Sequence, residues 1–349
     1  MSERRAFAVA LACGGLAALL SAAHAAAEPR VTLLDLPFRV TQLRDAGSEA
    51  ALAVTTAGLP QLPRKAGPVA VVWGEGGAAV LTLSGNRIAV VSLPLDAIEG
   101  LTVGETPKGA LPGTRRVLAG PVSAYLSGPS RGPDGRPGAA GVTLRERQTV
   151  TMSADPKPVP VVTATVPPGS GAVFSADTLR PVEIDGALHL LALGEHPEGT
   201  GLSLIGRQDG TWRVRAETPS EPGPLALAAD LPGPTPGAVL VRGAEGRLEH
   251  WSLAGGKPTR LAQGGKGGDG KGADGKGFAA PGAVLGSELV VASRDRAALA
   301  YVSLKDLTER ARASLPAPVG AGLAVLGRQV VVALADGRLA TVQDGDAQP

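Results

Sequence analysis

Few side chains in this 349-residue chain could bind a metal or transfer a proton near neutral pH. Beyond residue 24 the histidines are His189, His196 and His250. Zinc sites combine such residues with a second His or Cys at a short spacing, and none of the three has one. A zinc site would need ligands from distant segments, so we interpret each histidine as structural or solvent-facing.

Catalytic nucleophiles and paired carboxylates have no local signature either. The chain contains no G-x-S-x-G and no S-x-x-K motif, and its one cysteine is Cys13. Glu195 and Glu198 flank His196, and Asp295 lies between two arginines, as is typical of solvated turns. Carboxylates from distant segments could still meet in a central channel as general acid and base. The sequence leaves this enzymatic alternative open.

Aromatic residues make up only 3% of the chain, and three of them occupy similar positions near the end of a repeating strand-and-turn segment. Trp212, Trp251 and Tyr301 either fill space between sheets or offer flat faces for stacking on a ligand. We name these three residues, together with His250, as candidate binding residues.

A glycine-rich stretch at residues 264–277 reads GGKGGDGKGADGKG. It contains the start of a phosphate-binding loop, but Gly272 follows Lys271 where that motif has Ser or Thr, and no strand precedes it. We therefore interpret residues 264–277 as a flexible loop insert.

The first 25 residues have the pattern of a secretory signal peptide. Arg4 and Arg5 precede an apolar run at 6–20, and Ala23-His24-Ala25 offers small residues for cleavage. We expect cleavage between Ala25 and Ala27, and a protein exported to the periplasm or the extracellular space. No later run approaches the roughly 18 apolar residues of a membrane span.

Charge and cysteine content exclude several classes of partner and chemistry. The net charge is +2, and it falls to +1 once Glu3, Arg4 and Arg5 leave with the signal. Near neutrality argues against binding to nucleic acid or to an anionic membrane. Without Cys13 the exported chain has neither disulfides nor thiolate chemistry.

Short apolar runs dominate the remaining chain and are bounded by Gly, Asn and Asp, as strands and tight turns are. They include 31–34, 69–73, 78–83, 88–93, 188–193, 238–241, 248–253, 289–292, 298–304, 323–326, 330–334 and 339–342. Many are apolar at consecutive positions and therefore need cover on both faces. The best helical candidate, 303–315, has only a partial apolar stripe.

The spacing of the turns predicts a β-propeller. Gly210 and Gly246 are 36 residues apart, Arg296 follows after 50, and Gly337 after 41 more. Subtracting the 14-residue insert reduces the long interval to 36, close to the length of about 40–45 residues of a four-stranded blade. We expect an all-β propeller of about seven four-stranded blades at 28–345, with 31–34 pairing beside 339–342.

Two segments resemble the repeats of FG-GAP/VCBS-type propellers in exported bacterial proteins. In residues 173–186 the pattern V-F-x-x-x-x-x-R leads to Asp185-Gly186, and residues 225–241 resemble the next copy. The resemblance implies a calcium loop, of which Asp185 and Asp230 would be ligands. One acidic residue per loop supplies too few oxygens for Ca²⁺, which needs six to eight, so we expect no cofactor.

These observations favour an exported, monomeric, non-catalytic propeller that serves as a binding or assembly scaffold in the cell envelope. Its partner would be an envelope protein or a glycan. The alternative is a propeller-type glycoside hydrolase or lyase with its site in the central channel.

Overall fold

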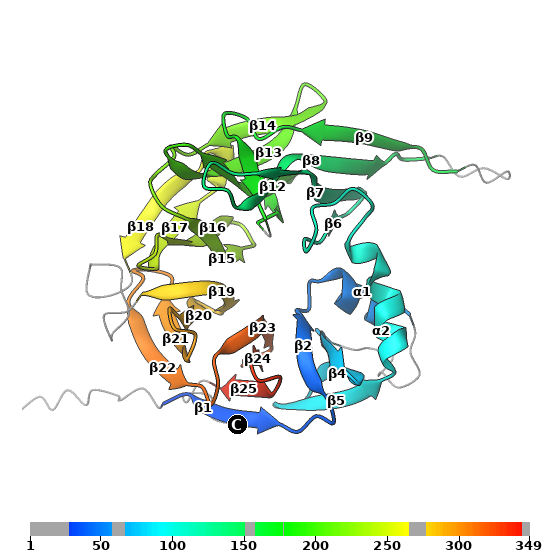
Figure 1. Cartoon of the computed structure of the whole chain (residues 1–349), viewed down its shortest axis with the longest axis vertical. Coiled ribbons are helices and arrows are strands. Elements are labelled where there is room, and N and C mark those ends of the chain that lie inside the picture. Colours follow the sequence, from blue (N-terminus) through cyan, green and yellow to red (C-terminus); the bar gives the residue numbers. More distant parts are fainter. Residues whose placement is uncertain (1–27, 58–66, 151–157, 177, 265–276, 344–349) are drawn as a thin grey trace, which may run out of the picture.

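Four-stranded antiparallel sheets form a ring around a central opening (Figure 1). The structure is a computed structural model that describes residues 28–57, 67–150, 158–176, 178–264 and 277–343. The expected signal peptide and nearly all of the glycine-rich insert lie outside the described residues.

The described strands make six blades. Blade 1 contains β2 (Arg39–Arg44), β3 (Ala70–Glu75), β4 (Gly77–Ser84) and β5 (Arg87–Leu93). Blade 2 contains β6 (Val117–Ala119), β7 (Val122–Arg131), β8 (Pro137–Arg147) and β9 (Val161–Val166). Blade 3 contains β11 (Arg180–Ile184), β12 (Ala187–His196), β13 (Gly199–Gln208) and β14 (Thr211–Glu217).

The second half of the chain repeats this order. Blade 4 contains β15 (Leu225–Leu231), β16 (Gly237–Arg242), β17 (Arg247–Ser252) and β18 (Thr259–Gly264). Blade 5 contains β19 (Phe278–Leu285), β20 (Glu288–Ser293), β21 (Ala298–Ser303) and β22 (Glu309–Ser314). Blade 6 contains β23 (Val319–Leu326), β24 (Gln329–Leu334), β25 (Leu339–Gln343) and β1 (Arg30–Leu34). A short strand, β10 (Val173–Ser175), pairs with both β8 and β12 and joins blades 2 and 3 into one sheet of nine strands.

The architecture confirms the predicted all-β propeller. Within the blades the chain runs outward, so that β2, β15, β19 and β23 lie near the central opening and β5, β18, β22 and β1 at the periphery (Figure 1). The described blades number six against the expected seven or so. The difference arises because helices and long connections occupy length that a regular period assigns to strands.

The ring closes as the sequence predicts. β1 pairs with β25 in antiparallel register, with Val31 opposite Val342 and Leu34 opposite Leu339. The first described strand thereby becomes the outermost strand of the last blade. Closure of this kind ties the two ends of the chain together and covers an edge that would otherwise be open.

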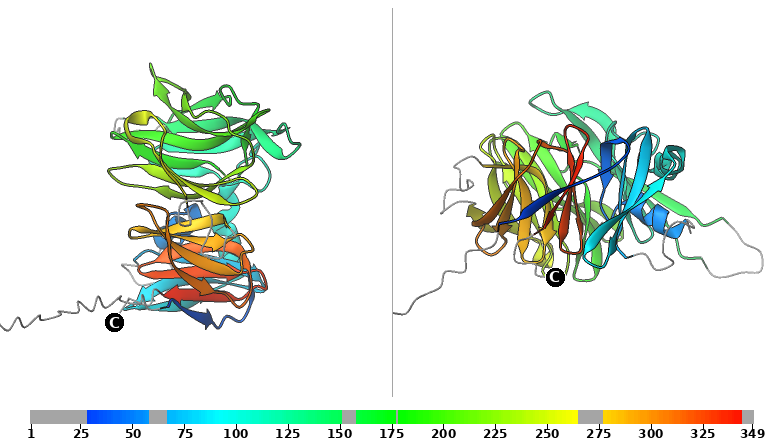
Figure 2. Two further views of the ribbon diagram at one scale, coloured as in Figure 1. Left: turned by 90° about the vertical axis from the view of Figure 1, so that its left-hand side faces the viewer. Right: turned by 90° about the horizontal axis from the view of Figure 1, so that it is seen from below.

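From blade 2 through blade 6 to blade 1, neighbouring blades pack face to face, as the views from the side and from below show (Figure 2). β24 illustrates why its run is apolar at every position. Val330 and Val332 belong to a buried cluster shared with blade 5, whereas Val331 and Ala333 belong to a cluster shared with blade 1. Similar clusters join blades 2 and 3, 3 and 4, and 4 and 5. Alternate side chains of one strand therefore serve two different interfaces.

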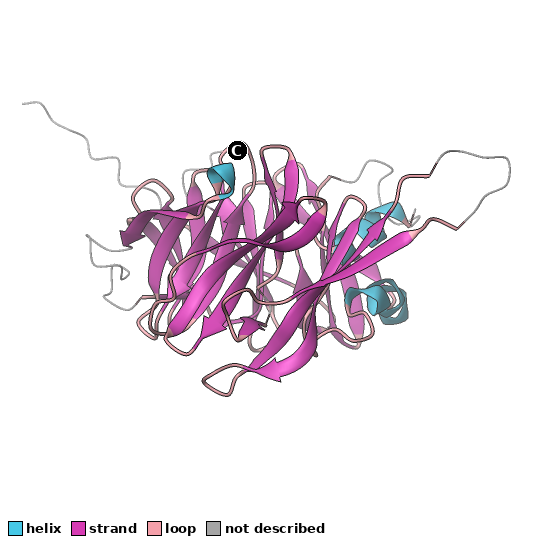
Figure 3. Ribbon diagram, turned by 90° about the horizontal axis from the view of Figure 1, so that it is seen from above, coloured by secondary structure: helices cyan, strands magenta, loops and turns pink. Residues whose placement is uncertain are grey.

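Two short helices next to blade 1 correct the expectation of a chain without helices (Figure 3). α1 (Glu49–Thr56) and α2 (Leu95–Thr102) bury Val54 and Ile98 against Val71 and Val80 of blade 1. Ser48 caps α1, since its Oγ accepts a hydrogen bond from the Ala51 N–H at 3.2 Å. The helical candidate 303–315 instead contains the end of β21, a turn and β22. No helix in the described part of the chain is long and apolar enough to cross a membrane.

Gly246, Arg296 and Gly337 occupy corresponding turns, each between the second and third strands of its blade. Gly210 lies between the third and fourth strands of blade 3, so the 36-residue interval compared unlike turns. All four residues have positive φ, from 60° to 86°. The Gly210 turn contains two residues, with Asp209 also at positive φ, whereas the other three turns contain four, so the two kinds of hairpin share a positive φ but differ in turn length.

Candidate functional site

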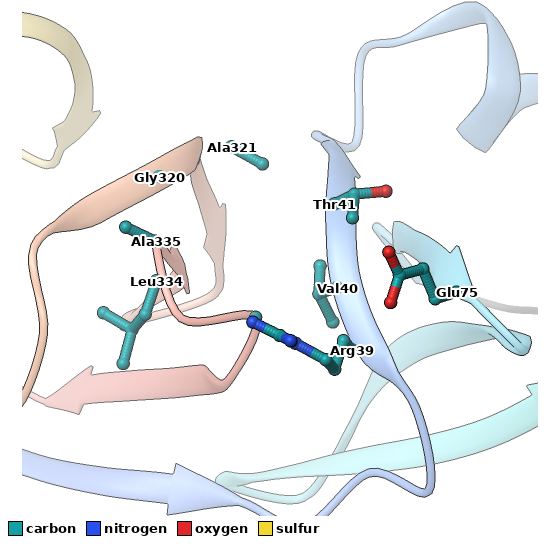
Figure 4. Close-up of a pocket in the computed structure, with 9 residues that line it drawn as sticks. Arg39, Val40, Thr41, Glu75, Gly320, Ala321, Leu334 and Ala335 are labelled. Carbon is teal, nitrogen blue, oxygen red and sulfur yellow. The ribbon is translucent and has the colours of Figure 1, made fainter.

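A hollow of about 410 Å³ lies between blades 6 and 1, beside their innermost strands. We call it the first hollow (Figure 4). Three elements of blade 6 and two of blade 1 supply its lining, which consists of Arg39, Val40, Thr41, Glu75, Gly320, Ala321, Leu334, Ala335 and Gly337.

The turn between β24 and β25 is held against β2 by backbone and side-chain contacts. The Val40 N–H donates to the Gly337 carbonyl at 2.8 Å, and Arg39 Nη2 donates to the Asp336 carbonyl at 3.1 Å. Arg338 pairs with the Asp336 carboxylate at 2.6 Å. Hydrogen bonding from Arg338 lowers the pKa of Asp336, so this carboxylate stays charged and keeps the turn in place.

The first hollow combines two exposed charges with small side chains. Its exposed charges are Arg39 and Glu75, which face each other in the β2–β3 register. Arg39 reaches toward the β24–β25 turn, while the Glu75 carboxylate lies beside Thr41 (Figure 4). No described residue forms a salt bridge with Glu75. Small side chains form much of the remaining wall, and the lining contains no paired nucleophile and base.

A second hollow, of about 450 Å³, lies between blades 3 and 4. It brings together Asp185 in the β11–β12 turn and Asp230 on β15, the two acidic residues that the sequence resemblance singles out. Glu183 contributes a third carboxylate, and the other lining residues are Pro181, Val182, Gly186, Leu231, Pro232, Gly233, Pro234 and Pro236. Even so, no group of three or more His, Cys, Asp or Glu among the described residues is placed to hold a metal ion.

The candidate aromatic residues lie at three different blade junctions. Trp251 and Tyr301 are buried on corresponding strands, in the clusters between blades 3 and 4 and between blades 5 and 6. Trp212 lies on an outermost strand and packs against the cluster between blades 2 and 3, with the Arg207 guanidinium 5.5 Å from its ring centre. They therefore form no common stacking surface.

His250 lies half-buried between blades 4 and 5, and its Nδ1 is 3.1 Å from the Leu304 carbonyl oxygen. Burial lowers the pKa of His250 from its usual value. The imidazole is therefore more often neutral than a solvent-exposed one at the same pH. His250 on β17 therefore contacts blade 5 and is a junction residue between the two blades.

Glu195 corrects the expectation of a solvated turn around His196. Its side chain is buried, and Ser175 Oγ donates to Glu195 Oε1 at 2.7 Å across β10 and β12. Asp295, by contrast, lies in an exposed turn, where its Oδ1 accepts from Ser293 Oγ at 2.6 Å. The difference arises because β12 extends through His196, which places Glu195 inside the sheet.

The innermost strands carry few titratable side chains. Within their described bounds these are Arg39 and Arg44 on β2, Arg180 and Glu183 on β11, and Asp230 on β15. β19 and β23 have none and consist mainly of Gly, Ala, Val and Leu. The centre of the ring therefore offers few groups for acid–base chemistry.

Sequence reasoning missed a buried ionic cluster between blades 3 and 4. Arg242 pairs with Glu249 at 2.6 Å, and Arg260 pairs with Glu221. The Arg260 guanidinium also lies 4.9 Å from the ring centre of Trp251. The signal in the sequence was the opposite charges of Arg242 and Glu249, which lie seven residues apart on the two strands of one otherwise apolar hairpin. The contact of Arg242 with Thr200 and the pairing of Arg260 with Glu221 could not be inferred, because those partners come from other segments of the chain.

The ring of blades closed by β1 defines this chain as a β-propeller. No protein-family model and no curated protein matches it. Solved structures with similarity include the CNH domain of AfRom2, with 8% identity over 87% of this chain and 82% of that one (TM-score 0.41). BamB from Moraxella catarrhalis has 14% identity over 81% of each chain (TM-score 0.36). The computationally designed Ika8 protein has 11% identity over 89% of this chain and 98% of that one (TM-score 0.45). At these levels the fold assignment depends on the strand pairing of this chain itself.

Proposed function

We propose that this chain is an exported, non-catalytic β-propeller that binds another protein in the cell envelope. The observation that carries the proposal is the first hollow. It joins one exposed cation, one exposed carboxylate and a wall of small residues at the inner rim of the ring. Such a surface can recognise the backbone and charges of an extended peptide segment without reacting with it.

Export is supported by the sequence of residues 1–25, with cleavage between Ala25 and Ala27. The described propeller begins only a few residues later, at β1. Intact-mass measurement of the protein recovered from the periplasm or medium tests this part. A mass corresponding to the chain from residue 26, 27 or 28 is expected, and an uncleaved chain in the cytoplasm contradicts export.

A relationship to FG-GAP/VCBS-type propellers is part of the proposal. Its support is that Asp185 and Asp230 lie at the inner hairpins of consecutive blades. Repeats that descend from one unit would place their loops in this way.

The binding proposal is tested by site-specific photocrosslinking. A photoreactive amino acid at Thr41 lines the first hollow, and the same substitution at Thr211, exposed on the outermost strand of blade 3, is the matched control. A defined envelope protein crosslinked from position 41 only is expected, and Glu75→Gln should weaken its binding, measured with the purified pair. Equal capture from both positions, or none from position 41, contradicts the proposal.

The second hollow favours one alternative, a glycoside hydrolase or lyase. Paired carboxylates are the groups that most glycosidases need, and Glu183, Asp185 and Asp230 line one cavity. Turnover of a panel of polysaccharides that disappears in Asp230→Asn would establish this alternative. We expect no turnover.

A further inference from the structure

β9 differs from the other outermost strands of the ring. β1, β5, β14, β18 and β22 each contain at least one arginine, whereas β9 has the uncharged sequence VVTATV. Charged residues on edge strands oppose pairing with another chain. In β9 two valines are also exposed, Val161 by 43% and Val162 by 54%. β9 therefore lacks the protection that the other edges have.

The position of β9 leaves one edge open. β9 pairs only with β8, and the two strands project from the ring (Figures 1 and 3). At the base of this hairpin Val166 is buried in the cluster between blades 2 and 3. Its base is thus fixed in the core, where Trp212 and Val214 of β14 pack against the same cluster, while no described strand is hydrogen-bonded to the edge away from β8.

The hydrogen bonds of the hairpin show which residues present their backbone to that edge. Gln148 N–H donates to the Pro160 carbonyl at 2.9 Å, whereas Arg147 N–H turns away to Pro121 at 3.0 Å. In an antiparallel pair this alternation continues residue by residue. Val162, Ala164 and Val166 therefore face β8 with their N–H and C=O groups. Val161, Thr163 and Thr165 direct theirs outward.

Prolines flank this open edge without blocking it. The nitrogen of Pro160 faces β8, so its missing N–H costs nothing at the outer side. Residues 161, 163 and 165 direct their backbone N–H groups outward. Pro167 is the next residue in this alternation, and it has no N–H to donate. The available edge is therefore short and has a defined end.

Residues 162–166 read the same in both directions, Val-Thr-Ala-Thr-Val. Two antiparallel copies centred on Ala164 would place Thr163 opposite the partner's Thr165, and Val162 opposite the partner's Val166. Like pairs of Thr and of β-branched residues are favourable cross-strand neighbours. The outward groups would form about six backbone hydrogen bonds, including one from each Val161 N–H to the partner's Pro167 carbonyl.

We propose that the exported protein forms a two-fold symmetric dimer through the β9 edges of two copies, which replaces the expectation of a monomer. A self-complementary strand without charge satisfies what an isologous interface requires, since the same surface serves both copies. Pairing of β9 with a strand from an unrelated protein would not require residues 162–166 to read the same in both directions.

Cysteine crosslinking tests this register directly, because the mature chain has no cysteine of its own. At the centre of the dimer the two Ala164 residues form a non-hydrogen-bonded pair, whose Cα atoms are about 4.5 Å apart and within disulfide range. Ala164→Cys should give a disulfide-linked dimer under mild oxidation. Ala89→Cys, on the outermost strand β5 and equally half-exposed, should stay monomeric.

Thr163→Lys supplies the second test, because it places a charge on the open edge without removing a described hydrogen bond. Light scattering of the wild-type protein should show a roughly two-fold rise in molar mass with concentration, and the variant should lose it. The melting temperature of the variant serves as a folding control. A wild-type protein that is monomeric throughout, or an Ala164→Cys variant that links only to a different envelope protein, overturns the proposal.

Discussion

Arg242 and Glu249 form a buried ion pair in blade 4, with Nε and Oε1 2.6 Å apart and side-chain exposures of 2% and 0%. Trp251 Nε1 donates to the same carboxylate at 3.0 Å, and Arg242 Nη1 donates to the Thr200 carbonyl of blade 3 at 3.3 Å. The pair therefore joins two blades through a set of hydrogen bonds that leaves neither charge isolated.

Glu249→Gln should destabilise the protein, because it removes the nearer of the two carboxylates that pair with the buried Arg242 and leaves only Glu221, 3.6 Å away. Breaking a buried pair on one side typically costs about 3–5 kcal/mol. The free energy of unfolding from urea titration measures the loss. Asp134→Asn, at an exposed ion pair with Arg136, is the matched control and should change little. Equal effects in the two variants would contradict a structural role for the buried pair.

His250 should make the stability fall in mild acid. Its pKa is lowered in the folded protein by burial, while the unfolded chain keeps a value of about 6.5. The unfolded state therefore binds more protons below this pH, and stability present above about pH 6.5 is lost as the pH falls toward the folded pKa. His250→Gln should flatten the slope of melting temperature between about pH 7.5 and pH 5. An unchanged slope would exclude His250 as its source.

Gly337→Ala should affect both the stability and the first hollow. Gly337 has a φ of +86°, and a Cβ there would lie 2.9 Å from the Arg39 Cβ. Gly210→Ala is the matched control, since φ is +76° but no atom lies within 4 Å of the added carbon. Backbone strain alone should cost about 1 kcal/mol in either variant. The additional loss of stability in Gly337→Ala measures the cost of the contact between the new Cβ and Arg39. Urea titration of both variants gives the two free energies of unfolding from which this difference is taken.

Calcium should not stabilise the protein. The carboxylates of Asp185 and Asp230 line one hollow, but they supply too few oxygen ligands for the ion. The melting temperature should be the same with EDTA and with added Ca²⁺. A rise with Ca²⁺ that is absent in Asp185→Asn would restore the metal role implied by the sequence resemblance.

Local patterns in the sequence determined many of the strands, several of their turns and the strand that closes the ring. Apolar runs such as 330–334 and turn residues such as Asp336-Gly337 act over a few positions, so neighbours along the chain suffice to predict them. The pairing of residues 31–34 with 339–342 was predictable too, because a ring of blades needs one strand to complete its last sheet.

Tertiary structure alone decided which residues meet between blades. Arg242 donates a hydrogen bond to the Thr200 carbonyl, and Asp185 lines the same hollow as Asp230. Trp251 and Tyr301 are buried in separate clusters. These contacts join segments far apart in the sequence, and they depend on the place of each hairpin within its blade. The turn at Gly210 resembles that at Gly246 in sequence and in φ, yet it belongs to the outer hairpin. Both glycines have a positive φ, but the first turn contains two residues and the second four, and this difference was apparent only from the strand pairing.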